Sequence, residues 1–507
     1  MFTAMPSRLF VLVLGVALAA APAHAQIPVF KAGFAERDIT PDIGAETPGG
    51  YGKAYHKSLH DPCKVRAAVF DDGKSAVALV GLDALFIHRQ TVIAVRKAIA
   101  QKTGLAENAI LLGASHSHSS GPMAGVMPGE YDHASKLVQK LAYEQSTVAD
   151  PKYLAKVEKA IIEAVCAAYE ARVSAKAGIG KGLEKSVAFN RRFTMREGRT
   201  ITHPGQGNPD ILEPAGPTDP EVGVIGVWDE KQKFLGCVVN FACHATTSPG
   251  GISANYIYYL EKVIQGYYGK DAVVVFLNGA SGDITQVDNQ SAVKHPTGDR
   301  WAQLVGGKVG AEALKVLLTM EPGVLVPVAA KANVLAIKRR PPAPERVKQC
   351  LDLVQQEPAK VGQTEWTFAK EIVMLDAKIA KEPVVDVEVQ AVQVGPAIFL
   401  TTPAEYFCRF GLDQKAKSGF PFTFPVSLAN GCVGYVPTED AFAATGGGYE
   451  TRLTSYSNLE ITAGTRMRDA GLELAKQLQP GAAPTPAKPL PFSGQPWSYG
   501  NVKPELK

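Results

Sequence analysis

The chain has 507 residues, of which 46% are hydrophobic and 20% charged, an ordinary composition for a globular protein. The formal net charge is only +4, and no run of lysine or arginine forms a basic stripe, so we expect no nucleic-acid partner. The length is sufficient for a large hydrophobic core and for more than one domain.

The N-terminus has the pattern of an export signal. Arg8 supplies a positive charge, residues 9–20 are apolar, and Ala23-His24-Ala25 has the small-x-small pattern of a cleavage site. The apolar run is shorter than the roughly 20 residues that span a bilayer, which disfavours a membrane anchor. We therefore expect residues 1–25 to be a signal peptide. The mature chain would then be exported, periplasmic or secreted, and without a transmembrane segment.

Strand-like and helical patterns alternate through the first half of the chain. The periodicity predicts a helix over 91–102 that stops at Gly104, and a longer amphipathic helix over 151–173. Short apolar, β-branched runs predict strands over 75–82, 109–112, 234–241 and 272–277. This order of elements favours an α/β fold with a mixed or largely parallel central sheet flanked by helices.

The second half contains fewer strands. The segment over 190–221 is polar, rich in Pro and Gly and without periodicity, which predicts a long functional or flexible loop. Residues 344–381 indicate one or two charged helices, and strands are predicted over 384–394 and 397–400. From residue 480 the chain is rich in proline. We expect a main domain over 26–479 and an extended tail over 480–507.

Polar side chains follow several of these strands directly. His116 and His118 come after 109–112, His244 after 234–241, Asp283 after 272–277 and Glu405 after 397–400. In open α/β sheets, ligands bind beyond the carboxyl ends of the strands. We therefore expect these side chains to form one active site at that edge of the sheet.

These side-chain types suit a metal ion. Neutral imidazole is a common zinc ligand, and residues two apart in an extended segment point the same way, so His116 and His118 can face one ion. Each motif also has a simpler interpretation. The His-x-His pair can be two solvent-facing loop residues, His244 a core histidine bonded to a carbonyl, and Glu405 the first residue of a helix.

Five short strings occur in the order of the neutral ceramidase family, which the chain resembles from about Lys31 to Gln477. They lie at 113–122, 240–248, 278–285, 403–405 and 430–435, and the segments at 32–41 and 59–62 also look like the N-terminal region of that family. The resemblance implies a ceramidase-like catalytic domain that binds one Zn²⁺ per chain. It implies cleavage of the amide bond of a small-molecule or lipid N-acyl substrate by attack of metal-bound water.

The resemblance also implies the residues of the site. The zinc ligands of the family correspond to His116, His244, Glu405 and Tyr435. His118 would lie beside the metal and contact the substrate or water. Arg191 and Tyr449 resemble the substrate-polarising arginine and the second tyrosine of the family's catalytic site.

The chain departs from the family in places. Thr285 stands where the family has a catalytic serine, and because it keeps a hydroxyl we expect it to keep a hydrogen-bonding role in the catalytic site. Its β-branching restricts the rotamer of that hydroxyl, which favours metal-bound water over Thr285 as the nucleophile. The segment over 190–221 is unlike that of the family. Because the chain ends soon after Gln479, we expect no C-terminal Ig-like domain of the kind those enzymes carry.

Two other functions stay open. The first is a serine-type esterase that uses Ser281, His244 and Asp283, although Gly279-Ala280-Ser281-Gly282 is not the Gly-x-Ser-x-Gly nucleophile elbow. The second is a non-catalytic exported binding protein. The intact set of metal ligands argues against this function, because a site that had lost its activity should lose its ligands first. Contact with a membrane surface and the oligomeric state are left open by the sequence.

Overall fold

The computed structural model describes residues 1–2, 29–485, 490–491, 494, 499 and 502–507. The predicted signal peptide over 1–25 therefore lies outside the described residues, apart from its first two positions. The predicted tail over 480–507 is described only in part, and the domain boundaries stay predictions. Within the described ranges, no helix combines the length and the apolar character that crossing a membrane requires.

The main sheet is mixed. It has eight strands in the order β12-β11-β10-β5-β1-β2-β3-β4. Only its outermost pairs, β11 with β12 and β3 with β4, are parallel, and the other neighbours are antiparallel. The strands are β1 (Lys31–Asp38), β2 (Lys64–Asp71), β3 (Ala76–Leu82), β4 (Ile110–Ala114), β5 (Val173–Leu183), β10 (Glu221–Asp229), β11 (Phe234–Phe241) and β12 (Val273–Asn278). The expected α/β fold with a mixed sheet is confirmed.

The main sheet curls back on itself. Strand β12 begins the strand order, yet it contacts β2, β3 and β4 near the other end. The approach of β3 to β12 is close enough to require glycine, because a Cβ on Gly81 would lie 2.5 Å from the carbonyl oxygen of Phe276. This curling brings the segments that follow β4, β11 and β12 to one place.

A second, four-stranded sheet packs against the curled sheet. Its order is β14-β15-β16-β18, with β16 and β18 parallel. The strands are β14 (Val328–Lys338), β15 (Val384–Val394), β16 (Ala397–Thr401) and β18 (Phe422–Val426). Side chains from both sheets, among them Phe70, Leu277, Val392 and Phe424, form one buried apolar cluster between them.

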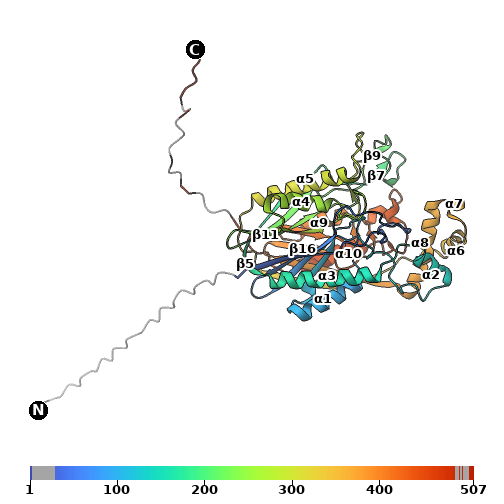
Figure 1. Cartoon of the computed structure of the whole chain (residues 1–507), viewed down its shortest axis with the longest axis horizontal. Coiled ribbons are helices and arrows are strands. Elements are labelled where there is room, and N and C mark those ends of the chain that lie inside the picture. Colours follow the sequence, from blue (N-terminus) through green and yellow to red (C-terminus); the bar gives the residue numbers. More distant parts are fainter. Residues whose placement is uncertain (3–28, 486–489, 492–493, 495–498, 500–501) are drawn as a thin grey trace.

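Helices cover the outer faces of the sheets. Helices α1 (Arg89–Thr103) and α3 (Pro151–Glu170) lie along one side of the molecule, and α4 (Tyr256–Tyr268) and α5 (Gly298–Leu318) along the opposite side (Figure 1). Helices α9 (Cys408–Lys417) and α10 (Ala463–Ala475) cover the second sheet. Helix α1 ends at Gly104 as predicted, where a φ of 77° allows the backbone N–H to reach the carbonyl of Ala100.

Four further helices gather at one end of the molecule (Figure 1). They are α2 (Lys136–Tyr143), α6 (Pro344–Leu353), α7 (Pro358–Val361) and α8 (Gln363–Lys381). Helices α2, α6 and α8 share an apolar cluster of their own that includes Leu141, Cys350 and Trp366. The range predicted to be helical, 344–381, is helical, but it holds three helices where one or two were predicted, because the short α7 lies between α6 and α8.

The segment over 190–221 is not a structureless loop, so this prediction was wrong. It contains a three-stranded sheet in the order β8-β7-β9, made of β7 (Arg192–Met195), β8 (Thr200–Thr202) and β9 (Ile211–Pro214). Each strand is too short for its alternation to be recognised in the sequence. Just before it, β6 (Phe189–Asn190) pairs with β13 (Ile284–Thr285), which ties the segment to the chain after β12.

Short elements complete the chain. Strands β17 (Glu405–Tyr406) and β19 (Tyr435–Val436) form a parallel pair. The described part of the chain also has three 3₁₀ turns, η1 (Glu107–Ala109), η2 (Glu439–Phe442) and η3 (Tyr449–Thr451). The β17–β19 pair and η3 carry three of the residues that the sequence singled out.

Candidate metal centre

His116 lies two residues beyond the end of β4 in a left-handed backbone conformation, with a φ of 65°. Such a φ is uncommon for a residue other than glycine and is concentrated at functional sites. Its Nδ1 lies 3.0 Å from the carbonyl oxygen of Leu85. Because a carbonyl only accepts, Nδ1 carries the proton of the neutral ring and the lone pair of Nε2 is free for a metal.

His244 is oriented in the same manner. It follows β11, and its Nδ1 lies 2.8 Å from the carbonyl oxygen of Ser281. Burial lowers the pKa of His244 to about 3, and the charge of Arg191 acts in the same direction. The ring is therefore neutral at physiological pH, and its Nε2 also presents a lone pair.

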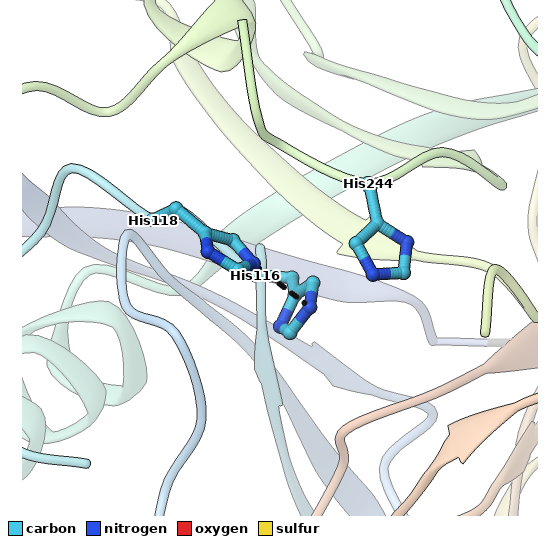
Figure 2. A group of neighbouring side chains, drawn as sticks. All are labelled: His116, His118 and His244. Carbon is cyan, nitrogen blue, oxygen red and sulfur yellow. Dashed lines mark hydrogen bonds between the residues drawn. The ribbon is translucent and has the colours of Figure 1, made fainter. Parts of the chain in front are cut away.

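His118 completes a group of three imidazoles. One ring nitrogen from each of His116, His118 and His244 lies within 4.8 Å of the others, and Figure 2 shows the three rings gathered from two segments of the chain. An isolated parallel β-bridge between Ser117 and Ala245 holds these two segments side by side. Burial holds the pKa of His118 well below its ordinary value, so this ring is neutral as well.

Glu405 adds a carboxylate to the group. Its Oε2 lies 3.1 Å from Nε2 of His116 and 3.0 Å from Nε2 of His244. The side chain is only 4% exposed. A buried carboxylate and three imidazoles are a donor set that can hold a metal ion.

The β17–β19 pair brings two tyrosines to the site. Glu405 and Tyr435 are register partners in this pair, and the hydroxyl oxygen of Tyr435 lies 3.2 Å from that of Tyr449. Burial holds the pKa of Tyr435 well above its ordinary value and raises that of Tyr449 to about 12. Both hydroxyls therefore keep their protons at neutral pH.

Arg191 lies between the tyrosines and His244. Its Nη1 is 3.1 Å from Nε2 of His244, and its guanidinium carbon lies 5.4 Å and 5.1 Å from the ring centroids of Tyr435 and Tyr449. Its Nε donates to Glu450 at 2.9 Å. A buried, paired guanidinium of this kind is a fixed positive charge next to the histidine group.

A cavity of about 1070 Å³ opens onto the group. Among the predicted site residues it is lined by His116, His118, Glu405, Tyr435 and Tyr449. The walls are largely apolar and include Leu85, Phe86, Met127, Phe368 and Met374. The volume lies just above the usual range of ligand pockets, about 300–1,000 Å³.

Thr285 stands apart from this arrangement. It is buried on β13 opposite Phe189, and it is not among the residues that line the cavity. The other predicted site residues are brought together, namely His116, His118, His244, Glu405, Tyr435, Tyr449 and Arg191. Their individual roles stay predictions.

The contacts around Ser281 do not form a serine-type relay. His244 contacts the carbonyl of Ser281, whereas the hydroxyl oxygen of Ser281 accepts from Asn278 at 3.0 Å. The carboxylate of Asp283 accepts from the side chain of Asn190 and from the backbone N–H of Cys408. The geometry therefore disfavours the esterase alternative.

The sequence did not reveal three residues that support the site. Tyr456 donates to Oε1 of Glu405 at 2.8 Å, Glu450 pairs with Arg191, and Gly49 approaches His118 so closely that a Cβ would lie 2.3 Å from Nδ1. Glu450 directly follows the predicted site residue Tyr449, so its position in the sequence could have pointed to it. Tyr456 and Gly49 are far from their partners along the chain, so no local pattern marks them.

Two solved structures resemble the chain over most of its length. A ceramidase complexed with C2 has 16% identity and a TM-score of 0.63, and it covers 90% of this chain and 77% of its own. The crystal structure of neutral ceramidase from Pseudomonas aeruginosa has 18% identity, a TM-score of 0.65 and the same coverage. No family model matches the chain, and no curated protein matches it. The fold implied by the five sequence strings is thus confirmed: the chain has the fold of the neutral ceramidases.

Proposed function

We propose that the protein is a zinc-dependent hydrolase that cleaves the amide bond of an N-acyl lipid. The convergence of His116, His118, His244 and Glu405 on one buried space carries this proposal. The ceramidase fold supports amide cleavage in particular.

The donor set fits zinc. Imidazole nitrogen and carboxylate oxygen are ligand types that Zn²⁺ accepts, and the carbonyls of Leu85 and Ser281 select the tautomers that present Nε2. Nε2 of His116 and Oε2 of Glu405 lie 3.1 Å apart, and their lone pairs would repel each other in this buried space unless a cation lies between them. We propose His116, His244 and Glu405 as three of the zinc ligands, and Tyr435, the register partner of Glu405, as the fourth.

When bound, Zn²⁺ acts as a Lewis acid that polarises a carbonyl and makes water more acidic. The chain contributes the other elements of the reaction. The neutral His118 can accept a proton from the attacking water. The hydroxyl of Tyr449 and the guanidinium of Arg191 can donate to the oxygen on which negative charge develops. The ion pair with Glu450 holds Arg191 in place.

The cavity supports a lipid as substrate. Its apolar walls can hold a hydrocarbon chain next to the site, and charged pairs such as Lys378 with Glu130 line it as well. The export pattern of residues 1–25 supports a periplasmic or secreted enzyme.

The first test is metal analysis of the purified protein together with hydrolysis of a fluorescent N-acyl sphingosine, with and without chelator. We expect one zinc per chain and cleavage that the chelator abolishes. Zinc without cleavage of this compound would contradict ceramide as substrate, and other N-acyl lipids would be tested next. Absence of bound metal would contradict the metal centre.

Substitution of the ligands tests the same proposal. We expect His116→Ala and His244→Ala to abolish turnover and to lower zinc content, while the circular dichroism spectrum stays that of the parent. The matched control is His133→Ala, because His133 also lines the cavity but is exposed and contacts the carbonyl of Ala377. Full activity in either ligand variant would refute the assignment.

A further inference from the structure

The two carboxylate oxygens of Glu405 have different neighbours. Oε2 faces Nε2 of His116 and Nε2 of His244, at 3.1 Å and 3.0 Å. Oε1 accepts a hydrogen bond of 2.8 Å from the hydroxyl of Tyr456. An ionised carboxylate only accepts, so the direction of this bond is fixed. One oxygen is thus engaged by the protein, and the other is turned toward the histidines.

Tyr456 is itself held firmly. Its ring stacks on Phe86 at a centroid distance of 5.8 Å and meets the edge of Tyr435 at 6.1 Å. Phe86 directly follows Leu85, whose carbonyl orients His116. The ring that holds Glu405 is therefore packed on the segment that holds one of the histidines, and a shift of this ring would disturb both.

Cys432 extends the chain of contacts. Its Sγ lies 3.2 Å from the hydroxyl oxygen of Tyr456. Because the single hydroxyl proton of Tyr456 is directed to Glu405, the thiol of Cys432 is the donor in this contact. The hydrogen bonds thus run in one direction, from Cys432 to Tyr456 and from Tyr456 to Glu405.

We propose that Tyr456 is a positioning residue that holds Glu405 as a single-oxygen ligand for the metal, and that Cys432 orients the hydroxyl of Tyr456. This inference rests on the proposed metal centre. Carboxylate ligands of metals are generally held by hydrogen bonds from a surrounding shell, and loss of such a partner costs about 10- to 100-fold in metal affinity.

The test compares the zinc affinity of purified full chains by competition with a chromophoric chelator. We expect Tyr456→Phe to bind zinc about 10- to 100-fold more weakly than the parent, and the visible spectrum of its Co²⁺ form to change. The matched control is Tyr406→Phe. Tyr406 adjoins Glu405 and is buried, but its hydroxyl donates to the carbonyl of Gly464 at 2.6 Å. We expect this control to keep the zinc affinity and the Co²⁺ spectrum of the parent.

A double-mutant cycle tests the role of Cys432. We expect Cys432→Ala to weaken zinc binding by about two- to threefold, the effect of one weak hydrogen bond, and to have no further effect when Tyr456→Phe is already present. Equal zinc affinity in the parent and in Tyr456→Phe would overturn this inference alone. Absence of zinc binding by the parent would overturn the metal centre and this inference with it.

Discussion

Nε2 of His118 lies 3.3 Å from Nε2 of His116. The carbonyl of Leu85 engages Nδ1 of His116, so in the neutral ring Nε2 carries only a lone pair. Burial holds the pKa of His118 well below its ordinary value, which disfavours a second proton on the ring of His118. The lone pair on Nε2 of His116 can thus accept either a hydrogen bond from His118 or a cation.

Thr285→Ala should retain turnover. Thr285 is buried on β13 outside the lining of the cavity, so removal of its hydroxyl should leave the reacting groups in place. We expect kcat/KM to stay within about tenfold of the parent, a change of at most about 1.4 kcal/mol. A complete loss of turnover, together with an acyl-enzyme that can be trapped in the parent, would demonstrate a covalent mechanism instead.

Gly49→Ala should disturb His118. The backbone φ of Gly49 is 91°, and a Cβ there would lie 2.3 Å from Nδ1 of His118. Gly44→Ala is a matched control, since Gly44 has a similar φ of 93° but a Cβ there would meet no atom within 4 Å. Both variants carry the backbone strain of a positive φ, about 1 kcal/mol. We expect only Gly49→Ala to lose activity, and equal activities in the two would contradict a role for this close approach.

Arg66→Met should destabilise the fold strongly. The guanidinium is 2% exposed and pairs with Asp83 at 2.8 Å and with Glu261, both of them buried. Removal of its charge leaves two buried carboxylates without this partner, which costs about 3–5 kcal/mol. The comparison is Lys476→Met, which breaks an exposed pair with Glu473 worth about 0–1 kcal/mol. Urea unfolding of both variants measures the two losses of unfolding free energy. Losses of similar size would contradict the strong stabilisation by Arg66.

Acid should destabilise the protein partly through His88. Burial lowers the pKa of His88 to about 4, against about 6.5 in an unfolded chain. Between these values the unfolded state binds a proton that the folded state does not, so stability falls as pH falls from about 6.5 to 4. We expect His88→Asn to flatten the dependence of the unfolding free energy on pH in this window. An unaltered slope in His88→Asn would contradict the buried, neutral state.

The sequence predicts those parts of the fold whose patterns are local. The bounds of β11 and β15 agree with the predicted 234–241 and 384–394, because each strand carries an apolar or alternating pattern along its whole length. His116 and His244 could be assigned to one edge of the sheet because each follows such a strand. The short strands β7 and β8 escaped prediction because they are stabilised by pairing with each other.

Contacts between distant segments account for the rest. The antiparallel neighbours of β5 are β1 and β10, a choice that no local pattern encodes. The hydrogen bond from Tyr456 to Glu405 joins residues 51 positions apart, and Tyr456 sits in a segment without a recognisable motif. The three histidines could therefore be predicted from the sequence, whereas Tyr456, which holds Glu405, could not.

Helices α6, α7 and α8 connect β14 to β15, and the residues at which the chain leaves and rejoins the sheet, Lys338 and Val384, are direct partners in the ladder. This helical segment between β14 and β15 supplies one wall of the cavity through Phe368, Glu371 and Met374. The histidines come from elsewhere, on the segments after β4 and β11. Changes in this helical segment can therefore alter the shape of the cavity, while β14 and β15 stay paired and the three histidines keep their positions. Substrate preference can then diverge independently of the reaction chemistry.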